Sequence, residues 1–131
     1  MSHWSERYLG EPWLSGEHDC WQFFRRVQRE QFGFDIPEVD LPFDAGNTLS
    51  CARALTEGRE CDKWSETDRP TEGCAVLLAR GTRPTHVGVW VDANGGAVLH
   101  CARGSGVVLQ DLASLNRHGW GGMRFYRRAH G

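Results

Sequence analysis

The apolar residues of this 131-residue chain change their spacing once, and that change is the strongest constraint on its fold. Residues 19–32 carry apolar side chains at helical spacing, with Asp19 as N-cap and Gln22 completing a capping-box-like pair. From Cys74 onward the runs are short, and Thr85–Asp92 alternates between apolar and other residues. Because helices come first and strands follow, we predict an α+β fold with N-terminal helices packed on a central antiparallel sheet, rather than an alternating α/β fold.

Turn residues and shorter apolar runs predict the remaining elements. We expect a short helix near residues 3–9, a second helix over 47–57 and a helical turn over 111–116. Residues 58–73 are polar and turn-like. The strands are predicted at residues 74–79, 85–92, 97–101, 106–109 and 123–127.

Length and composition narrow the class of protein. The chain has the size of a single domain over 1–131, and 40% hydrophobic with 24% charged residues excludes a disordered chain. A net charge of −2 argues against a nucleic-acid binder, and no apolar run is long enough for membrane insertion. No apolar stretch follows a basic start, so we expect no signal peptide and synthesis in the cytoplasm.

The five cysteines are an odd number and form no Cys-x-x-Cys pair, which disfavours a disulfide framework or a zinc site. We expect no metal and no organic cofactor. One reactive cysteine among inert ones is the better interpretation. The cysteines are Cys20, Cys51, Cys61, Cys74 and Cys101.

Cys20 is the first candidate for chemistry because it follows the predicted N-cap directly. Unpaired backbone N–H groups and the helix dipole stabilise an anion there, which lowers the pKa of a thiol from its free value of about 8.5. Cys20 also begins the apolar stripe of the helix, so its sulfur should face the sheet. A buried structural cysteine is the alternative interpretation, and the position alone does not separate the two.

His86 stands at the head of the alternating strand, on the same face as Gly88 and Trp90. An imidazole can take the proton of a cysteine nucleophile near neutral pH. Taken alone, His86 is equally well explained as a surface or a satisfied core histidine. Trp90 would line the groove or simply pack in the core.

His100, at the end of the next strand, could orient the first imidazole. If the two strands pair symmetrically around a turn centred on Ala93, His100 lies directly opposite His86. A tight turn at Asn94-Gly95 would instead turn His100 to the other face, unless a bulge or wider loop compensates.

Three other features have plain structural interpretations. Asp19 is expected to cap the helix rather than to act on a substrate. His18 and Cys20 form a His-x-Cys pair, which rarely makes a metal site without further ligands. The segment Arg103-Gly104-Ser105-Gly106 is read as a β-turn rather than an anion-binding loop.

Three segments carry a further signal: Tyr8–Trp13 followed by Asp19-Cys20-Trp21, then Thr85–Trp90, then Val98–Ala102. In order and approximate spacing they resemble motifs of the NlpC-type cysteine peptidases. Those motifs read Gly-x-Pro-Tyr with a later Asp-Cys-Ser-Gly, then Ser-His-Val-Gly-Ile-Tyr, then Ile-His-Ala. Trp21 in place of the usual serine, and the tail over 125–128, are similar to the phage tail-assembly branch of that family.

The resemblance implies a papain-like fold and cleavage of bacterial peptidoglycan stem peptides, of the γ-D-glutamyl-diaminopimelate type. It implies Cys20 as nucleophile, His86 as base and His100 as the residue that orients the base. Trp13 stands where the family has a tyrosine that contacts substrate or oxyanion, and Tyr8 is another possible donor. Phage tail proteins would be partners, and the virion tail a location.

Three alternatives stay open at this stage. The first is a structural component of a phage tail tip that keeps the fold with little activity. The second is a secreted antibacterial effector amidase with the same chemistry. A metal-binding module is the least favoured.

Overall fold

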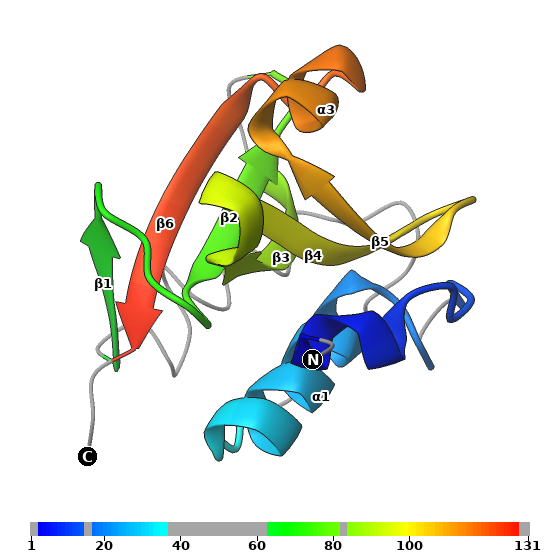
Figure 1. Ribbon diagram of the computed structural model, residues 1–131, viewed down its shortest axis with the longest axis vertical. Helices are drawn as coiled ribbons and strands as arrows, with labels where there is room; N and C mark the ends of the chain where they lie inside the picture. Colours follow the sequence, from blue (N-terminus) through cyan, green and yellow to red (C-terminus); the bar gives the residue numbers. More distant parts are fainter. Residues whose placement is uncertain (1–2, 15–16, 37–62, 82–83, 129–131) are drawn as a thin grey trace.

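The computed structural model describes residues 3–14, 17–36, 63–81 and 84–128, and within them the fold is α+β (Figure 1). The helical elements are η1 (Trp4–Tyr8), α1 (Cys20–Phe32), η3 (Ala93–Gly95) and α3 (Leu112–Arg117). The strands are β1 (Trp64–Thr67), β2 (Ala75–Ala79), β3 (Pro84–Val91), β4 (Ala97–Ala102), β5 (Gly106–Asp111) and β6 (Gly122–Arg128). They form one antiparallel sheet in the order β1-β6-β2-β3-β4-β5.

Helix α1 begins and ends where its sequence predicts. The Asp19 side chain accepts a hydrogen bond from the backbone N–H of Gln22 at 3.0 Å, which satisfies one free donor of the first turn. Gly33 ends the helix in the left-handed conformation at φ 75°, and its N–H bonds back to the carbonyl of Arg29. The predicted capping role of Asp19 is confirmed.

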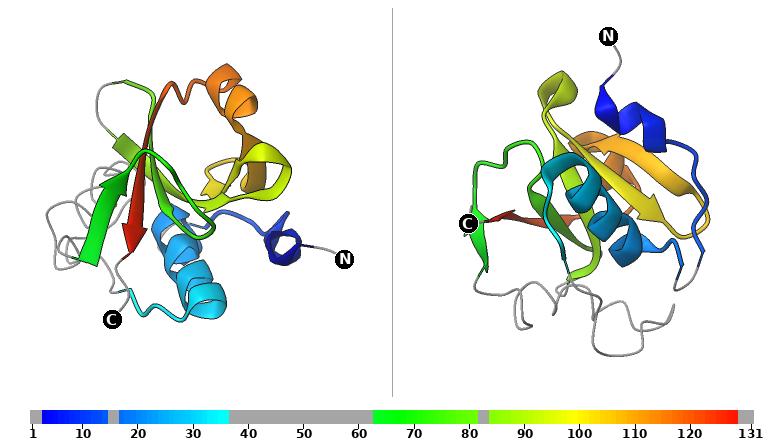
Figure 2. Two further views of the ribbon diagram at one scale, coloured as in Figure 1. Left: turned by 60° about the vertical axis from the view of Figure 1, so that its left-hand side comes forward. Right: turned by 90° about the horizontal axis from the view of Figure 1, so that it is seen from below.

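The two faces of the sheet are covered by different elements (Figures 1 and 2). Helix α1 packs across β3 and β4 on one face, and α3 follows β5 on the other side. Two hydrophobic clusters result, which we call the α1-side cluster and the α3-side cluster. The α1-side cluster includes Phe23, Phe24, Val27, Leu77, Val87, Val89, Leu99 and Cys101. The α3-side cluster includes Cys74, Val76, Leu78, Trp90, Val98, Leu115 and Trp120.

Strand β3 alternates as predicted. Val87, Val89 and Val91 are fully buried in the α1-side cluster, whereas Trp90 belongs to the α3-side cluster. His86 pairs directly with Leu78, a member of the α3-side cluster, so its side chain points to the same face as Leu78.

The connection between β3 and β4 differs from both predicted registers. The paired residues run from Val91↔Ala97 to Val89↔Leu99, because the short helix η3 makes a wider loop than a two-residue turn. This register places His100 beside Gly88, where a β-carbon on Gly88 would come within 3.0 Å of the His100 β-carbon. His86 and His100 therefore share a face but lie diagonally rather than opposite.

One predicted segment is wrong and another cannot be compared. Residues 64–67, within the region expected to be turn-like, form strand β1, with Trp64 buried and paired with Arg128 of β6. That partner is distant in the sequence, so local polarity could not reveal it. The predicted helix over 47–57 lies outside the described residues. In the described parts of the chain, no helix has the length and apolarity needed to cross a bilayer.

The segment before α1 is attached to the outer strand β5. Val107 donates its N–H to the carbonyl of Glu11 at 2.9 Å, and Gly10 donates to the carbonyl of Val107 at 3.1 Å. Gly106 permits this approach, because it has a φ of 75° and a β-carbon there would collide with the Glu11 carbonyl oxygen. The attachment covers part of an otherwise open sheet edge.

We expect Gly106→Ala to destabilise the protein more than the matched Gly104→Ala. Both glycines have positive φ, which costs a non-glycine residue about 1–2 kcal/mol. Only Gly106 adds a backbone collision, worth about 1–3 kcal/mol more. Urea unfolding of the two variants measures the difference, and equal destabilisation would contradict the close contact with Glu11.

Candidate active site

Two imidazoles form a direct pair inside the protein. His86 Nε2 and His100 Nδ1 share a hydrogen bond of 2.8 Å, with ring centroids 4.9 Å apart and planes at 79°. The other nitrogen of His100, Nε2, lies 2.7 Å from Oε1 of Gln110. Three neighbouring strands, β3, β4 and β5, thus each contribute one member of a continuous chain.

An aromatic wall fixes the outer imidazole. The His86 ring stacks on Trp120 with centroids 5.1 Å apart and planes only 16° from parallel. The guanidinium of Arg80 lies 4.0 Å from the centroid of the same indole. Stacking and the hydrogen bond to His100 together restrict the ring of His86 to one orientation.

His100 is fully buried, and this sets its protonation state. Burial lowers the pKa of His100 to about 3, and the neighbouring charge of His86 lowers it further, while the hydrogen bond to Gln110 raises it in part. His100 is therefore neutral near pH 7 and can act as a hydrogen-bonding partner without adding charge.

Cys20 is the first residue of α1 and is 3% exposed. It belongs to the α1-side cluster together with Val87 and Cys101. The Cys101 sulfur lies 3.3 Å from the carbonyl oxygen of His18, just before α1. Burial raises the pKa of Cys101 to about 12, with smaller contributions from Cys20, Asp19 and Glu11, so Cys101 stays an unreactive thiol at neutral pH.

The structure brings two of the three predicted catalytic residues into contact. His86 and His100 meet on the α3 face of β3 and β4, and their chain neighbours Val87 and Cys101 face α1. Cys20 belongs to the same cluster as those neighbours. The direction of its sulfur and its role as nucleophile stay predictions.

The structure buries Tyr8. Its hydroxyl donates to Glu30 at 2.7 Å and accepts from Gln31 at 3.0 Å. Burial, followed by the hydrogen bond to Glu30, raises the pKa of Tyr8. These partners lie at the end of α1 opposite Cys20, so the phenol anchors η1 to α1, and its role toward a substrate stays a prediction.

Trp13 remains a candidate for contact with substrate. Its indole is half-buried beside the α1-side cluster, and the guanidinium of Arg103 lies 5.4 Å from its centroid. An isolated antiparallel bridge pairs Leu14, the residue after Trp13, with His18, just before α1. Arg103 itself begins the turn between β4 and β5, where Ser105 donates to the carbonyl of Ala102, as the β-turn interpretation predicts.

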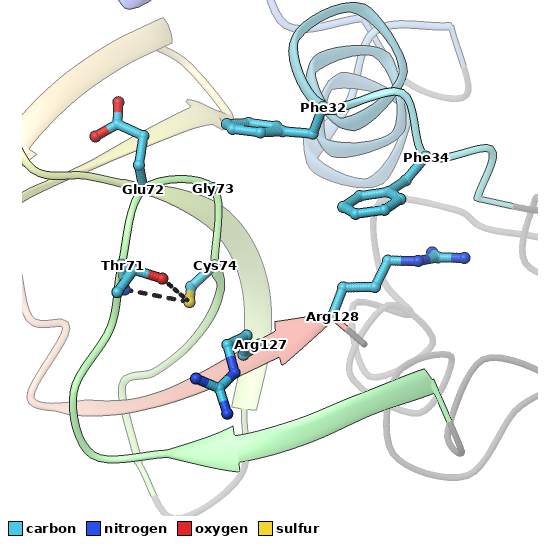
Figure 3. Close-up of a pocket in the computed structure, with 8 residues that line it drawn as sticks. All are labelled: Phe32, Phe34, Thr71, Glu72, Gly73, Cys74, Arg127 and Arg128. Atoms are coloured by element: carbon cyan, nitrogen blue, oxygen red, sulfur yellow. Dashed lines mark hydrogen bonds between the residues drawn. The ribbon is translucent and has the colours of Figure 1, made fainter. Parts of the chain in front are cut away.

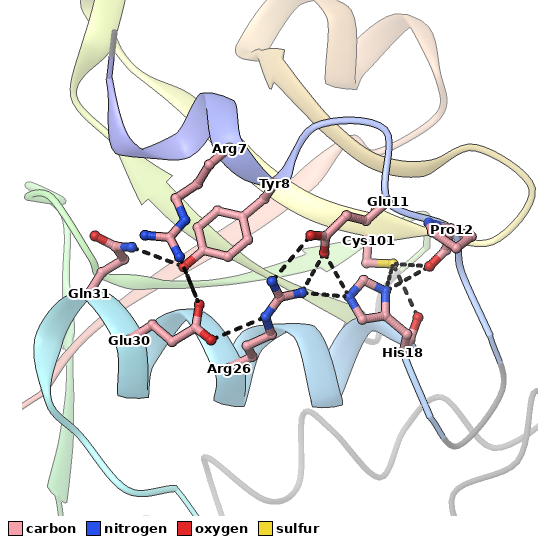
Figure 4. A network of polar contacts seen from close by, with 9 residues as sticks. All are labelled: Arg7, Tyr8, Glu11, Pro12, His18, Arg26, Glu30, Gln31 and Cys101. Atoms are coloured by element: carbon pink, nitrogen blue, oxygen red, sulfur yellow. Dashed lines mark hydrogen bonds and ion pairs between the residues drawn. The ribbon is translucent and has the colours of Figure 1, made fainter.

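A polar network that the sequence did not reveal holds the segment before Cys20 (Figure 4). Arg26 makes a two-point contact with Glu11, at 2.5 and 3.2 Å, and also bonds to Glu30 at 3.3 Å. His18 bonds to the Pro12 carbonyl at 2.7 Å and approaches Glu11 at 3.0 Å. In the sequence, only the i,i+4 spacing of Arg26 and Glu30 indicates a part of this network.

No cluster of three or more potential metal ligands exists within the described residues. A separate hollow of about 220 Å³ lies where β2 begins and β6 ends (Figure 3). Within it, the backbone N–H of Thr71 points to the Cys74 sulfur at 3.3 Å. None of the predicted site residues lines it. The lining residues are Phe32, Phe34, Thr71, Glu72, Gly73, Cys74, Arg127 and Arg128.

Gln110 is the site residue that sequence reasoning missed. The strand predicted over 106–109 was two residues too short, because β5 continues to Asp111. In the observed register Gln110 pairs with Val98 of β4, and so shares the face of His100. Extending the alternation of β5 by two residues would have found it.

Comparison with known proteins gives a distant similarity. No family model matches the chain. It is 28% identical over 102 residues to a protein named murein DD-endopeptidase MepS/murein LD-carboxypeptidase from Escherichia coli strain K12. The same values hold for the proteins of that name from strains O6:H1 and O157:H7. The match covers 78% of this chain and 44% of each relative, so the chain spans less than half the length of the curated relatives it matches.

We expect His100 to make the protein less stable as the pH falls. Its folded-state pKa of about 3 lies below the unfolded value of 6.5, so the unfolded chain binds more protons between these values. Stability is complete above pH 6.5 and is lost toward pH 3, by up to about 1.4 kcal/mol per pH unit. Urea unfolding between pH 7 and 5.5 should give a smaller slope for His100→Gln, and an unchanged slope would contradict a buried neutral His100.

Proposed function

We propose that this protein is a cysteine peptidase that hydrolyses peptide bonds in bacterial peptidoglycan stems, of the γ-D-glutamyl-diaminopimelate type. The observation that carries the proposal is the hydrogen-bonded chain of His86, His100 and Gln110, in which both imidazoles are buried. Burying two imidazoles removes them from water, a cost that an apolar pair at the same positions would avoid. Such an arrangement is typical of a general base held by an orienting partner.

Two further observations support the proposal, one on the substrate class and one on the nucleophile. The similarity to a murein endopeptidase extends over 102 residues, and the three sequence motifs described above fall in the order of the NlpC-type peptidases. Cys20 lies at the start of a 13-residue helix, where backbone N–H groups stabilise a thiolate.

The proposed reaction needs no group beyond the protein and water. His86 takes the proton from the Cys20 thiol, and the thiolate attacks the scissile carbonyl carbon. The backbone N–H of Cys20 and the indole N–H of Trp13 hold the oxyanion. The imidazolium then protonates the leaving amine, and water, deprotonated by His86, releases the acyl group and restores the thiol.

This mechanism requires the Cys20 sulfur and the His86 ring to meet. Backbone pairing between β3 and β4 runs from Val91↔Ala97 to Val89↔Leu99, and both histidines lie beyond that ladder. At that end, the hydrogen bond between the two imidazole rings links β3 to β4 in place of backbone hydrogen bonds. We propose that the contact between thiol and imidazole forms at this end of the two strands, because catalytic contacts often form fully only in the substrate complex.

A second candidate is favoured by the burial of Cys20, which is only 3% exposed, as a structural cysteine would be. In this alternative the chain keeps the fold and has little or no activity, as a structural component such as part of a phage tail tip. The two candidates differ in one property, the turnover of peptidoglycan peptides that depends on Cys20.

We expect the protein to cleave purified muropeptides and Cys20→Ala to lower cleavage to background, because no other described thiol combines a helix start with proximity to β3. Mass spectrometry of the digested muropeptides measures the rate and identifies the bond. Cys74→Ala is the matched control, since it also removes a buried thiol but lies in the turn before β2 rather than at the start of a helix. Cys74→Ala should retain activity.

Retained cleavage by Cys20→Ala would defeat the proposed mechanism. The absence of cleavage by the folded parent protein would favour the structural candidate. Alkylation by iodoacetamide near neutral pH gives a second measure, because a thiolate at Cys20 should react before the other four thiols. Equal reaction of all five would contradict an activated nucleophile.

A further inference from the structure

Gln110 occupies a position in which it can decide where the protons of both imidazoles lie. Its side chain is the only amide in the chain His86–His100–Gln110, and an amide has two unlike ends, an oxygen that only accepts and a nitrogen that only donates. The end that faces His100 therefore determines which His100 nitrogen carries hydrogen.

The far side of Gln110 contacts α3. Its Nε2 donates to the hydroxyl of Ser114 at 3.0 Å, and its Oε1 faces His100 Nε2 at 2.7 Å. Ser114 is itself held in α3, where its backbone N–H bonds to Asp111 at 2.8 Å. The first turn of α3 thus supplies the partner of the amide nitrogen at the end of β5.

His118 lies close to this contact. Its Nδ1 is 2.8 Å from the carbonyl oxygen of Ser114, an atom that can only accept, so Nδ1 carries a proton. The 3.3 Å approach of Gln110 Nε2 to this nitrogen therefore joins two N–H groups, and the Ser114 hydroxyl is the acceptor.

The proton positions then follow in sequence. Because Gln110 Oε1 accepts, His100 carries its hydrogen on Nε2 and has a free lone pair on Nδ1. That lone pair accepts from Nε2–H of His86 across the 2.8 Å contact. His86 is left with an unprotonated Nδ1, which is the form a general base needs. The reversed amide would place the hydrogen of His86 on Nδ1 and abolish its basicity there.

We propose that Gln110 is a positioning residue that sets the tautomers of His100 and His86 so that Nδ1 of His86 is free to accept a proton. The inference rests on the proposed function for its consequence in catalysis. The tautomers themselves are properties of the resting protein and can be measured without any substrate.

The first experiment is long-range ¹H–¹⁵N NMR of the histidine rings in the parent protein near neutral pH. It distinguishes a nitrogen that carries hydrogen from one that does not. We expect His86 and His100 both to carry hydrogen on Nε2 alone. Hydrogen on Nδ1 of either residue, or two interconverting forms, would overturn the proposal whatever the activity of the protein.

Two substitutions at Gln110 separate tautomer control from mere packing. Gln110→Glu presents only acceptor oxygens, so the NMR pattern should be kept. Gln110→Leu fills the position without an acceptor, so we expect a mixture of tautomers. The matched variant Gln31→Leu, which removes a glutamine bond to Tyr8 on the α1 side, should leave the pattern unchanged. A parental pattern in Gln110→Leu would contradict the proposal.

If muropeptide cleavage is observed, the kinetics provide a second readout. We expect Gln110→Leu to lower kcat/KM by about 10²-fold, a typical share of general-base catalysis. Gln110→Glu should retain turnover but move the acidic limb of the pH profile upward, because a carboxylate stabilises the imidazolium. Arg80 and His118 also act on His100, and they are unchanged in all these variants. If the parent protein is inactive, the proposed function fails while the NMR result still decides the role of Gln110.

Discussion

The burial of β3 and β4 on both faces is the constraint on which the rest of this structure depends. Helix α1 covers one face and the α3-side cluster covers the other, so the buried side chains of residues 86–91 and 97–101 enter one of two filled layers. The valines of β3 enter the layer beneath α1, and His86 enters the opposite layer. A polar group in such a layer needs a partner, which explains why His86, His100 and Gln110 are bonded into one chain.

The two layers also contain different kinds of reactive side chain. The layer beneath α1 contains thiols, with Cys20 at the helix start and Cys101 kept protonated by burial. The layer beneath α3 contains the imidazoles: burial keeps His100 neutral, and His86 stacks on Trp120. In the proposed mechanism, the thiol and the imidazole meet at the strand ends beyond the β3–β4 ladder. The segment before α1 is bonded both to β5 and to Arg26 of α1.

Prediction from the sequence succeeded where the determining forces were local. The limits of α1 follow from Asp19 and Gly33, and the two-sided pattern of β3 follows from its alternation. It failed where a distant partner decided the outcome. Strand β1 exists because Trp64 is buried against β6, and the β3–β4 register depends on the loop formed by η3.

The sequence by itself determined the types of residue available for chemistry, the helix that begins at Cys20 and the common face of His86 with Gly88 and Trp90, because capping and alternation act between near neighbours. Only the tertiary structure decided that His86 and His100 share a hydrogen bond, that Gln110 ends their chain and that α1 packs on the other face. Those outcomes depend on strand register and on the side of the sheet that each helix covers, and both are set by contacts between segments far apart in the chain.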